Sequence, residues 1–422
     1  MARKLLICTA LAFFALWACD KDNEVAAPEP DDHTAVTPGG QKEEQTPPQS
    51  AGEEWESAAS AVRNMGAGWN LGNTLDSNSG DVDNMWIEAY TSRTPSDYET
   101  AWGQPVTTRE LIHMFKEAGF GAIRVPVTWY PHMGTITVSG KSWDMSSWTG
   151  NEVDPAWMAR VKEVVDYVID EGMYCILNVH HDTGSASTAW LVAGGEEFKA
   201  SKTRYQALWE QIANTFKDYG ERLLFESYNE MLDPLDSWCF ASFAAPGGYD
   251  ASMATEAYAV INYYAALFAE TVRATGGNNA LRNLIVNTYA ACSGDGTWSS
   301  HLKEPLTKMQ IPEEPGHIAI EVHSYWEADK FDSQKADIDQ LFINLYENIA
   351  LRLSVPVIIG EWGGGSDSDS EANVRFASYF SQKAKDAEIA AFWWMGLSNG
   401  SDRSIPAWSI PQTKDAILEA YK

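Results

Sequence analysis

Two glutamates, Glu230 and Glu361, stand in the sequence settings that paired-carboxylate chemistry needs. Each lies at the end of a short apolar run, Leu223–Tyr228 for the first and Val357–Gly360 for the second. Cleaving the bond between two sugars takes one carboxyl group that donates a proton and one carboxylate, and a gap of ~5–5.5 Å makes the carboxylate a nucleophile. A lone glutamate is usually a solvated surface charge. Two that both end apolar runs favour a pair, with Glu230 as acid/base and Glu361 as nucleophile.

Further polar side chains end runs of the same kind. They are Arg124, His180, His181, Asp182, Asn229, His323, Ser324, Tyr325, Trp393 and Trp394. We expect Arg124 and Tyr325 to hold Glu361 ionised, because a cation and a hydrogen-bond donor both favour a carboxylate. For His180, a hydrogen-bonding role in a cleft is the better interpretation.

Eight apolar runs predict the strands that position these residues. They are 66–71, 122–127, 174–179, 223–228, 284–288, 318–322, 357–360 and 390–395. Between them lie helical patterns, which include a capping box at Thr107–Glu110 and an Asp154-Pro155 helix start. Further patterns cover roughly 202–218, 252–275, 335–352, 371–386 and 411–421, whereas 290–312 is poorly patterned. The alternation predicts an α/β fold, a single-domain (β/α)8 TIM barrel over residues 55–422.

A barrel explains how the two glutamates meet. Its chemistry lies at the C-terminal ends of the strands. The fourth and seventh strands stand on roughly opposite walls, so Glu230 and Glu361 can face each other across the opening. We also expect long loops near 72–106, 181–201 and 231–251 to build the walls of a cleft.

At this point the chain resembles glycoside hydrolase family five, the cellulase-type retaining barrels. The stretches that carry the resemblance are Gly68–Thr74, Ile123–Val127, Leu177–His181, Leu224–Glu230, His323–Tyr325, Val357–Gly363 and Phe392–Trp394, in order over the whole predicted barrel. The resemblance implies acid/base at Glu230, nucleophile at Glu361 and a contact from Asn229 to the sugar 2-hydroxyl. It also implies a central subsite framed by Arg124, His180, His323 and Tyr325, with Trp394 under the reacting sugar. His181 and Asn73 are further substrate-binding candidates within these stretches.

One residue departs from the family pattern. Met231 stands where many family members have proline after the acid/base. A proline there shapes the following loop, so the departure concerns the leaving-group side of the cleft.

The leading hypothesis is an endo-acting β-1,4-glucanase that acts on a β-glucan polysaccharide or oligosaccharide. Two alternatives stay open: an endo-β-mannanase on the same scaffold, and a surface glycan-binding protein without turnover. No cofactor and no metal are expected. Successive strand residues point to opposite faces, so the rings of His180 and His181 should diverge unless the strand has ended, and no spacing supplies three converging ligands.

Tryptophans are abundant, at 18 in 422 residues. Flat rings cover the faces of pyranose sugars. Eight tryptophans lie in loops after predicted strands: Trp102, Trp129, Trp143, Trp148, Trp190, Trp238, Trp298 and Trp326. We expect about half of them to line the cleft and the rest to pack loops.

The N-terminus predicts export. Residues 1–19 combine Arg3 and Lys4 with a short apolar segment and end in Leu16–Cys19, which resembles a bacterial lipobox with Cys19 as the lipidated residue. Residues 20–54 are acidic and proline-rich, which predicts a disordered linker. We therefore expect a protein tied to the outer membrane by its lipid alone, and facing the cell surface.

Charge and cysteines exclude other classes. Lys and Arg number 30 against 59 Asp and Glu, so a nucleic-acid partner is unfavourable. After Cys8 and Cys19, only Cys175, Cys239 and Cys292 remain, and none form a CxxC pair. A zinc site or disulfide framework is not expected, pairing of Cys239 with Cys292 stays open, and a monomer is favoured.

Overall fold

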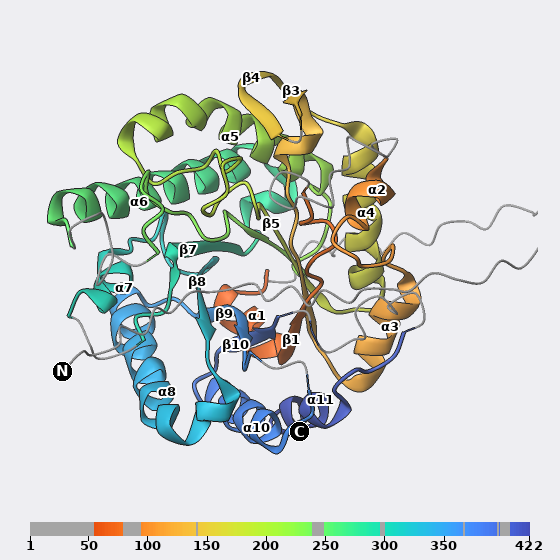
Figure 1. Cartoon of the computed structure of the whole chain (residues 1–422), viewed down its shortest axis with the longest axis vertical. Helices are drawn as coiled ribbons and strands as arrows, with labels where there is room; N and C mark the ends of the chain where they lie inside the picture. Colours follow the sequence, from red (N-terminus) through yellow and green to blue (C-terminus); the bar gives the residue numbers. More distant parts are fainter. Residues whose placement is uncertain are drawn as a thin grey trace, which may run out of the picture. The chain divides into compact units, whose positions relative to one another are not determined.

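Eight parallel strands close into a barrel in the computed structural model (Figure 1), which describes residues 55–78, 94–140, 142–238, 249–295, 300–365, 368–394, 396 and 406–422. The barrel strands are β1 (Ala67–Asn70), β2 (Ala122–Val125), β5 (Tyr174–Asn178), β6 (Leu223–Glu226), β7 (Leu284–Cys292), β8 (Ile318–Tyr325), β9 (Val357–Gly363) and β10 (Ala390–Trp393). Their order around the barrel is β1-β10-β9-β8-β7-β6-β5-β2. The predicted α/β barrel is confirmed, and each predicted strand corresponds to one of these.

Helices surround the strands (Figure 1). The longer ones are α1 (Ala58–Met65), α3 (Arg109–Ala118), α4 (Pro155–Asp170), α5 (Gly195–Thr215), α6 (Ala251–Ala274), α8 (Phe331–Leu345), α10 (Glu371–Asp386) and α11 (Pro411–Glu419). The shorter ones are α2 (Pro95–Glu99), α7 (Glu304–Lys308) and α9 (Leu351–Leu353), the last preceded by a π-helical turn at Tyr346–Ala350. In the poorly patterned fifth connection, the described residues form a 3-10 turn, Ser300–Lys303, and α7.

The start of α3 differs by one residue from the expected capping box. Thr108 is the N-cap, and its hydroxyl accepts from the backbone N–H of Leu111. Thr107 does not cap the helix. Its backbone N–H donates to Glu99, and its backbone carbonyl accepts from Arg160. The helix ends at Gly119, whose φ of 109° suits glycine.

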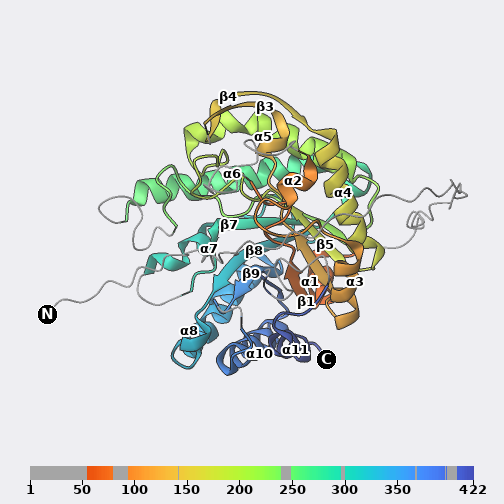
Figure 2. The ribbon, with the colours of Figure 1, turned by 45° about the vertical axis from the view of Figure 1, so that its right-hand side comes forward.

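A β-hairpin that the strand prediction did not contain follows β2. Strands β3 (Met133–Ser139) and β4 (Ser142–Val153) pair antiparallel, and β4 contacts α5 (Figure 2). Trp143 and Trp148 lie buried in the hairpin. The connection that follows β2 is therefore also long, like the three long loops expected from the sequence, and it contains secondary structure of its own.

Irregularities in the ladder between β8 and its neighbours shape the C-terminal end of the barrel. Ala290 and Ala291 near the end of β7 have φ values of 54° and 49°, and the β7–β8 register shifts between Asn287 and Cys292. The β8–β9 register shifts between Val322 and His323, which sets His323 beside Glu361. Such bulges re-aim side chains near active sites.

Several sequence expectations fall outside the described residues. These are the signal segment with Cys19, the linker, Cys239 and Trp298. Among the helices that the structure does describe, none combines the length and the apolar character that crossing a membrane requires.

Candidate active site

The structure brings Glu230 and Glu361 together at the C-terminal end of the barrel. Glu361 lies within β9, and Glu230 lies four residues past the end of β6. A carboxylate oxygen of each, together with a ring nitrogen of His323, lies within 4.8 Å of the other two. The side chain of Glu361 is 7% exposed and that of Glu230 is 22% exposed. The more open carboxyl group is the one to which the sequence assigns proton transfer.

Both oxygens of Glu361 accept a hydrogen bond. Arg124, on β2, donates from Nη1 to Oε1 at 2.8 Å. Tyr325, at the end of β8, donates its hydroxyl proton to Oε2 at 2.5 Å. Donors of this kind favour the ionised carboxylate, which is the state a nucleophile needs.

Arg124 is fully buried and is surrounded by acceptors. Nε and Nη2 donate to the two oxygens of Glu226 at 2.7 and 2.8 Å. Nη2 also donates to Oδ1 of Asn229 at 2.8 Å, and Nη1 to Oδ1 of Asn70 at 2.9 Å. Burial opposes the charge, but Glu226, Glu321 and Glu361 outweigh it and raise the pKa of Arg124 well above its ordinary value. The guanidinium therefore remains a fixed cation beside Glu361.

His323 bridges two carboxyl groups. Its Nδ1 lies 2.7 Å from Oε1 of Glu230, and its Nε2 lies 3.2 Å from Oε1 of Glu321. Burial opposes protonation of the ring, but Glu361, Glu230 and Glu321 together raise the pKa of His323 to about 10. The ring is therefore an imidazolium that donates from both nitrogens.

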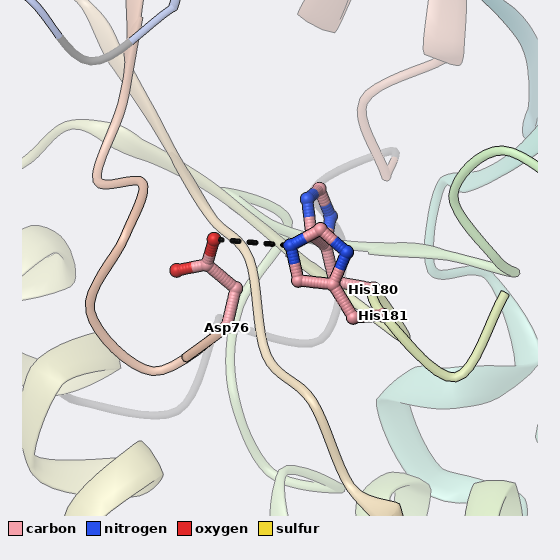
Figure 3. Close-up of side chains that lie close together, drawn as sticks. All are labelled: Asp76, His180 and His181. Carbon is pink, nitrogen blue, oxygen red and sulfur yellow. Dashed lines mark ion pairs between the residues drawn. The ribbon is translucent and has the colours of Figure 1, made fainter. Parts of the chain in front are cut away.

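His180 and His181 follow the end of β5 and lie close together (Figure 3), with ring centroids 4.5 Å apart. The exception stated in the prediction applies here, because β5 ends at Asn178 and strand alternation no longer sets the direction of the two rings. His180 is buried; burial, His181 and Arg124 lower its pKa well below the ordinary value. Nδ1 of His180 accepts from Nδ2 of Asn178 at 3.0 Å, because Oδ1 of Asn178 is occupied by Val127 N–H. The remaining ring N–H, on Nε2, lies 3.8 Å from Glu361.

Asp76 holds His181 in place (Figure 3). Its Oδ2 lies 3.7 Å from Nε2 of His181, and the two carboxylate oxygens accept from the backbone N–H groups of Asn73 and Thr74 at 3.0 and 2.7 Å. Partial burial opposes the charge on His181, but Asp76 raises its pKa. Asn73 has a φ of 57°. The hydrogen bonds from the backbone N–H groups of Asn73 and Thr74 to Asp76 stabilise this turn.

Metal-ligand geometry exists at two places, contrary to the expectation that no three ligands converge. Donor atoms lie within 4.8 Å of one another in Asp76–His180–His181 and in Glu230–His323–Glu361. In both groups hydrogen bonds or ion pairs within the protein already engage these side chains. The absence of a metal stays a prediction.

Asn229 and Trp394 complete the set. Oδ1 of Asn229 accepts from Arg124, which leaves its amide N–H groups as donors. Trp394 follows β10 and stacks on His180, with centroids 5.8 Å apart and ring planes 9° apart. The ring is therefore a flat apolar surface beside His180, whose Nε2 lies 3.8 Å from Glu361.

The loop tryptophans divide between packing and partial exposure. Trp129, Trp143, Trp148 and Trp326 are buried. Trp102, Trp190 and Trp238 are half-buried, and Trp102 lies against His181 with centroids 5.2 Å apart. Met231, where the family pattern has proline, is buried. Its backbone carbonyl accepts a hydrogen bond from the backbone N–H of Ala290.

Sequence reasoning missed the buried polar residues beneath the two carboxylates. They are Asn70, Asp76, Asn178, Glu226 and Glu321. Glu226 and Glu321 each interrupt an apolar strand run, Leu-Leu-Phe-Glu and Ile-Ala-Ile-Glu-Val. A charge inside a strand that is buried on both faces is a signal of a paired interior site.

Comparisons with known proteins agree with this geometry. The family model "Cellulase (glycosyl hydrolase family 5)" matches residues 86–400. The chain is 33% identical to Endoglucanase A of Clostridium longisporum, over 87% of this chain and 66% of that protein. It is 32% identical to Endoglucanase A of Ruminococcus albus, over 87% of this chain and 93% of that one. The Clostridium relative is thus longer than the matched part.

Solved structures are similar over the same region. A broad specificity endoglucanase from an uncultured bacterium has 48% identity and a TM-score of 0.77, with 87% of this chain and 97% of that chain covered. PbGH5A of Prevotella bryantii B14, solved with a xyloglucan tetradecasaccharide, has 38% identity and a TM-score of 0.73, with 87% and 99% covered. The chain belongs to the cellulase family, glycosyl hydrolase family 5.

Proposed function

We propose that the protein is an endo-acting β-1,4-glucanase that cleaves its substrate with retention of configuration. The observation that carries the proposal is the approach of Glu230 and Glu361 oxygens to within 4.8 Å. Carboxyl groups this close suit direct attack by a carboxylate, whereas inverting enzymes hold theirs ~6.5–9.5 Å apart to admit a water.

The reaction has two steps. An oxygen of Glu361 attacks the anomeric carbon, the bond to the leaving oxygen breaks, and Glu230 gives that oxygen its proton. Water then attacks the same carbon, Glu230 takes the water proton, and the bond to Glu361 breaks. Arg124 and Tyr325 hold the Glu361 carboxylate in place through their hydrogen bonds. Asn229 presents amide donors to the sugar, and Trp394 presents a ring beneath it.

The substrate class is a β-glucan chain, with branched xyloglucan among the accepted forms. Support comes from relatives named endoglucanases and from the neighbour solved with a xyloglucan tetradecasaccharide. A further neighbour from Ruminococcus champanellensis was solved with cellotriose, at 31% identity and a TM-score of 0.68.

A polysaccharide panel tests the function. Barley glucan, carboxymethyl cellulose, xyloglucan and mannan are incubated with the protein and with Glu361→Ala, and the products are sized. Short glucan fragments that Glu361→Ala does not release support the proposal. Cleavage of mannan alone indicates the mannanase, and binding without any product indicates a glycan-binding protein.

The N-terminal signals lead to a second proposal, on location. Cys19 becomes the lipidated first residue of the mature chain, and residues 20–54 tether the enzyme to the outer membrane with the barrel facing outward. Its support is the sequence pattern alone. Radioactive palmitate labelling of the chain, lost in Cys19→Ala, tests the anchor. Protease treatment of intact cells tests the face, and an uncleaved protein indicates a periplasmic one. Sedimentation velocity tests the expected monomer.

A further inference from the structure

Glu321 is a third carboxyl group beneath the catalytic pair. It lies on β8, two residues before His323, and is fully buried. Its Oε1 lies 3.2 Å from Nε2 of His323 and 3.4 Å from Nε of Arg124. Its Oε2 meets no N–H donor among the residues that the structure describes, and the buried carboxyl group of Glu226 is its hydrogen-bond partner. Burying two carboxyl groups against each other at such depth is costly, which points to a role beyond packing.

The neighbouring strand leaves space for this carboxyl group. A Cβ atom on Gly360 of β9 would lie 1.7 Å from Oε1 of Glu321. The φ of Gly360 is not positive, so the backbone conformation does not call for glycine here. Glycine is required because Glu321 fills the position that a side chain would take.

The bond from His323 to Glu321 determines how the ring meets Glu230. With Nε2 directed at Glu321, Nδ1 faces Oε1 of Glu230 at 2.7 Å. If Nε2 lost this acceptor, the ring could rotate, and the hydrogen bond that orients the acid/base would be lost. Arg124 does not replace it, because a guanidinium has no acceptor. Glu230 and Glu361 do not replace it either, because they face the other ring nitrogen, Nδ1, at 2.7 and 3.6 Å.

We propose that Glu321 is a positioning residue, which anchors Nε2 of His323 and thereby orients Glu230 for proton transfer to the leaving oxygen. The charged groups that face it are Arg124 from β2, Glu226 from β6 and His323 from β8. Burial and Glu226 raise the pKa of Glu321 to about 8, so the group is mainly uncharged at neutral pH. The inference rests on the proposed function.

Leaving-group dependence separates this role from a general structural one. A substrate with a very good leaving group, 2,4-dinitrophenyl β-cellobioside, needs no proton from Glu230, whereas a cello-oligosaccharide does. We expect Glu321→Ala to lower kcat/KM about 10- to 100-fold for the oligosaccharide and less than threefold for the dinitrophenyl substrate. An equal loss for both substrates, or no loss for either, would overturn the proposal.

Two further variants guard against misfolding. Glu321→Gln keeps the shape and an acceptor for Nε2, so we expect near wild-type kcat/KM at pH 6, together with a lower pKa of His323 in nitrogen-15 NMR. An unchanged His323 pKa in this variant contradicts the proposed contact. The double variant Glu321→Ala/Gly360→Ala refills the space, and we expect it to regain melting temperature without regaining oligosaccharide activity.

The control is another buried glutamate. Glu99 is buried and bonded by Arg160 at 2.9 Å, and Glu99→Gln should lower the melting temperature without changing the leaving-group dependence. If the wild-type protein cleaves no glycan, the proposed function fails. The NMR comparison of the His323 pKa in wild type and Glu321→Gln still decides whether Glu321 anchors the ring.

Discussion

Arg124 and Arg282 are the two fully buried arginines among the residues that the structure describes, and their charges are stabilised in different ways. Arg124, at the C-terminal end, is surrounded by the carboxyl groups of Glu226, Glu321 and Glu361. Arg282 lies just before β7, at the opposite end, and its partners are neutral oxygens. They belong to Phe216, Tyr219, Gly220, Leu223 and Asn279.

The two environments shift the two pKa values in opposite directions. Burial and Arg273 lower the pKa of Arg282 to about 9, whereas the carboxylates keep that of Arg124 well above its ordinary value. By donating to these oxygens, Arg282 connects the loop before β6 to the start of β7. This is a structural function. The Arg124 end gathers several buried ionisable groups with strongly shifted pKa values, Glu321 and His323 among them. A cluster of this kind marks the end that does chemistry.

The largest contrast should come from removing one acceptor at each end. Glu361→Ala should lower kcat on β-glucan on the order of 10⁴-fold or more, because the nucleophile is gone, with little loss of melting temperature. Asn279→Ala, which removes the acceptor of Arg282 Nε, should cost about 1–3 kcal/mol of unfolding free energy and leave kcat unchanged. Steady-state kinetics and thermal unfolding of both variants check this, and an active Glu361→Ala enzyme would refute the mechanism.

Replacing the arginines themselves should separate activity from stability. Each of Arg124→Met and Arg282→Met should cost about 3–5 kcal/mol, since each strands buried partners. Only Arg124→Met should also lower kcat, by about 10²-fold, because Glu361 loses its cation. Activity is measured per folded molecule, by active-site titration. Equal kcat losses would show that the two ends do not differ as described.

Glu226→Gln should have a smaller effect than either arginine change. Glu226 is among the groups that raise the pKa of Glu321, so without its charge Glu321 can ionise and act as counter-ion to Arg124. We expect a loss of kcat of about tenfold or less and a smaller fall in melting temperature than in Arg124→Met. A larger fall in melting temperature than in Arg124→Met would show that Glu321 cannot replace Glu226 as the counter-ion of Arg124.

The smallest effect concerns pH and stability. Glu321 has a folded-state pKa of about 8, above its ordinary value, so the folded protein retains a proton that the unfolded chain loses. Its contribution to stability is fully present below about pH 4.5 and is lost as the pH rises through about 8. His323, at about 10, adds a loss between about pH 6.5 and 10. Melting temperature should therefore fall from pH 5 to 8, and Glu321→Gln should flatten this fall. The oxygens that surround Arg282 are neutral and do not titrate, so they contribute nothing to this dependence of melting temperature on pH.

The sequence predicted the barrel and the residues at its opening better than what lies beneath them. Apolar runs located each strand of the barrel, because strands buried on both faces leave a continuous signal. The β3–β4 hairpin was missed, since one face is exposed and its apolar residues are spaced irregularly. The roles of Glu226 and Glu321 were missed because each lies inside such an apolar run. Their partner, Arg124, lies on a strand that is distant in the chain. The nearness of His180 to His181 depended on where β5 ends, to within one residue.

Trp394 illustrates how little has to move when a sugar arrives. Its ring stacks on His180 on one side, and a Cβ atom on Gly72 would lie 2.8 Å from its outer edge. Contacts on two sides thus restrict the rotation of the indole. A pyranose that settles on it does not have to freeze that side chain, so more of the contact free energy remains for distorting the sugar toward its reactive shape.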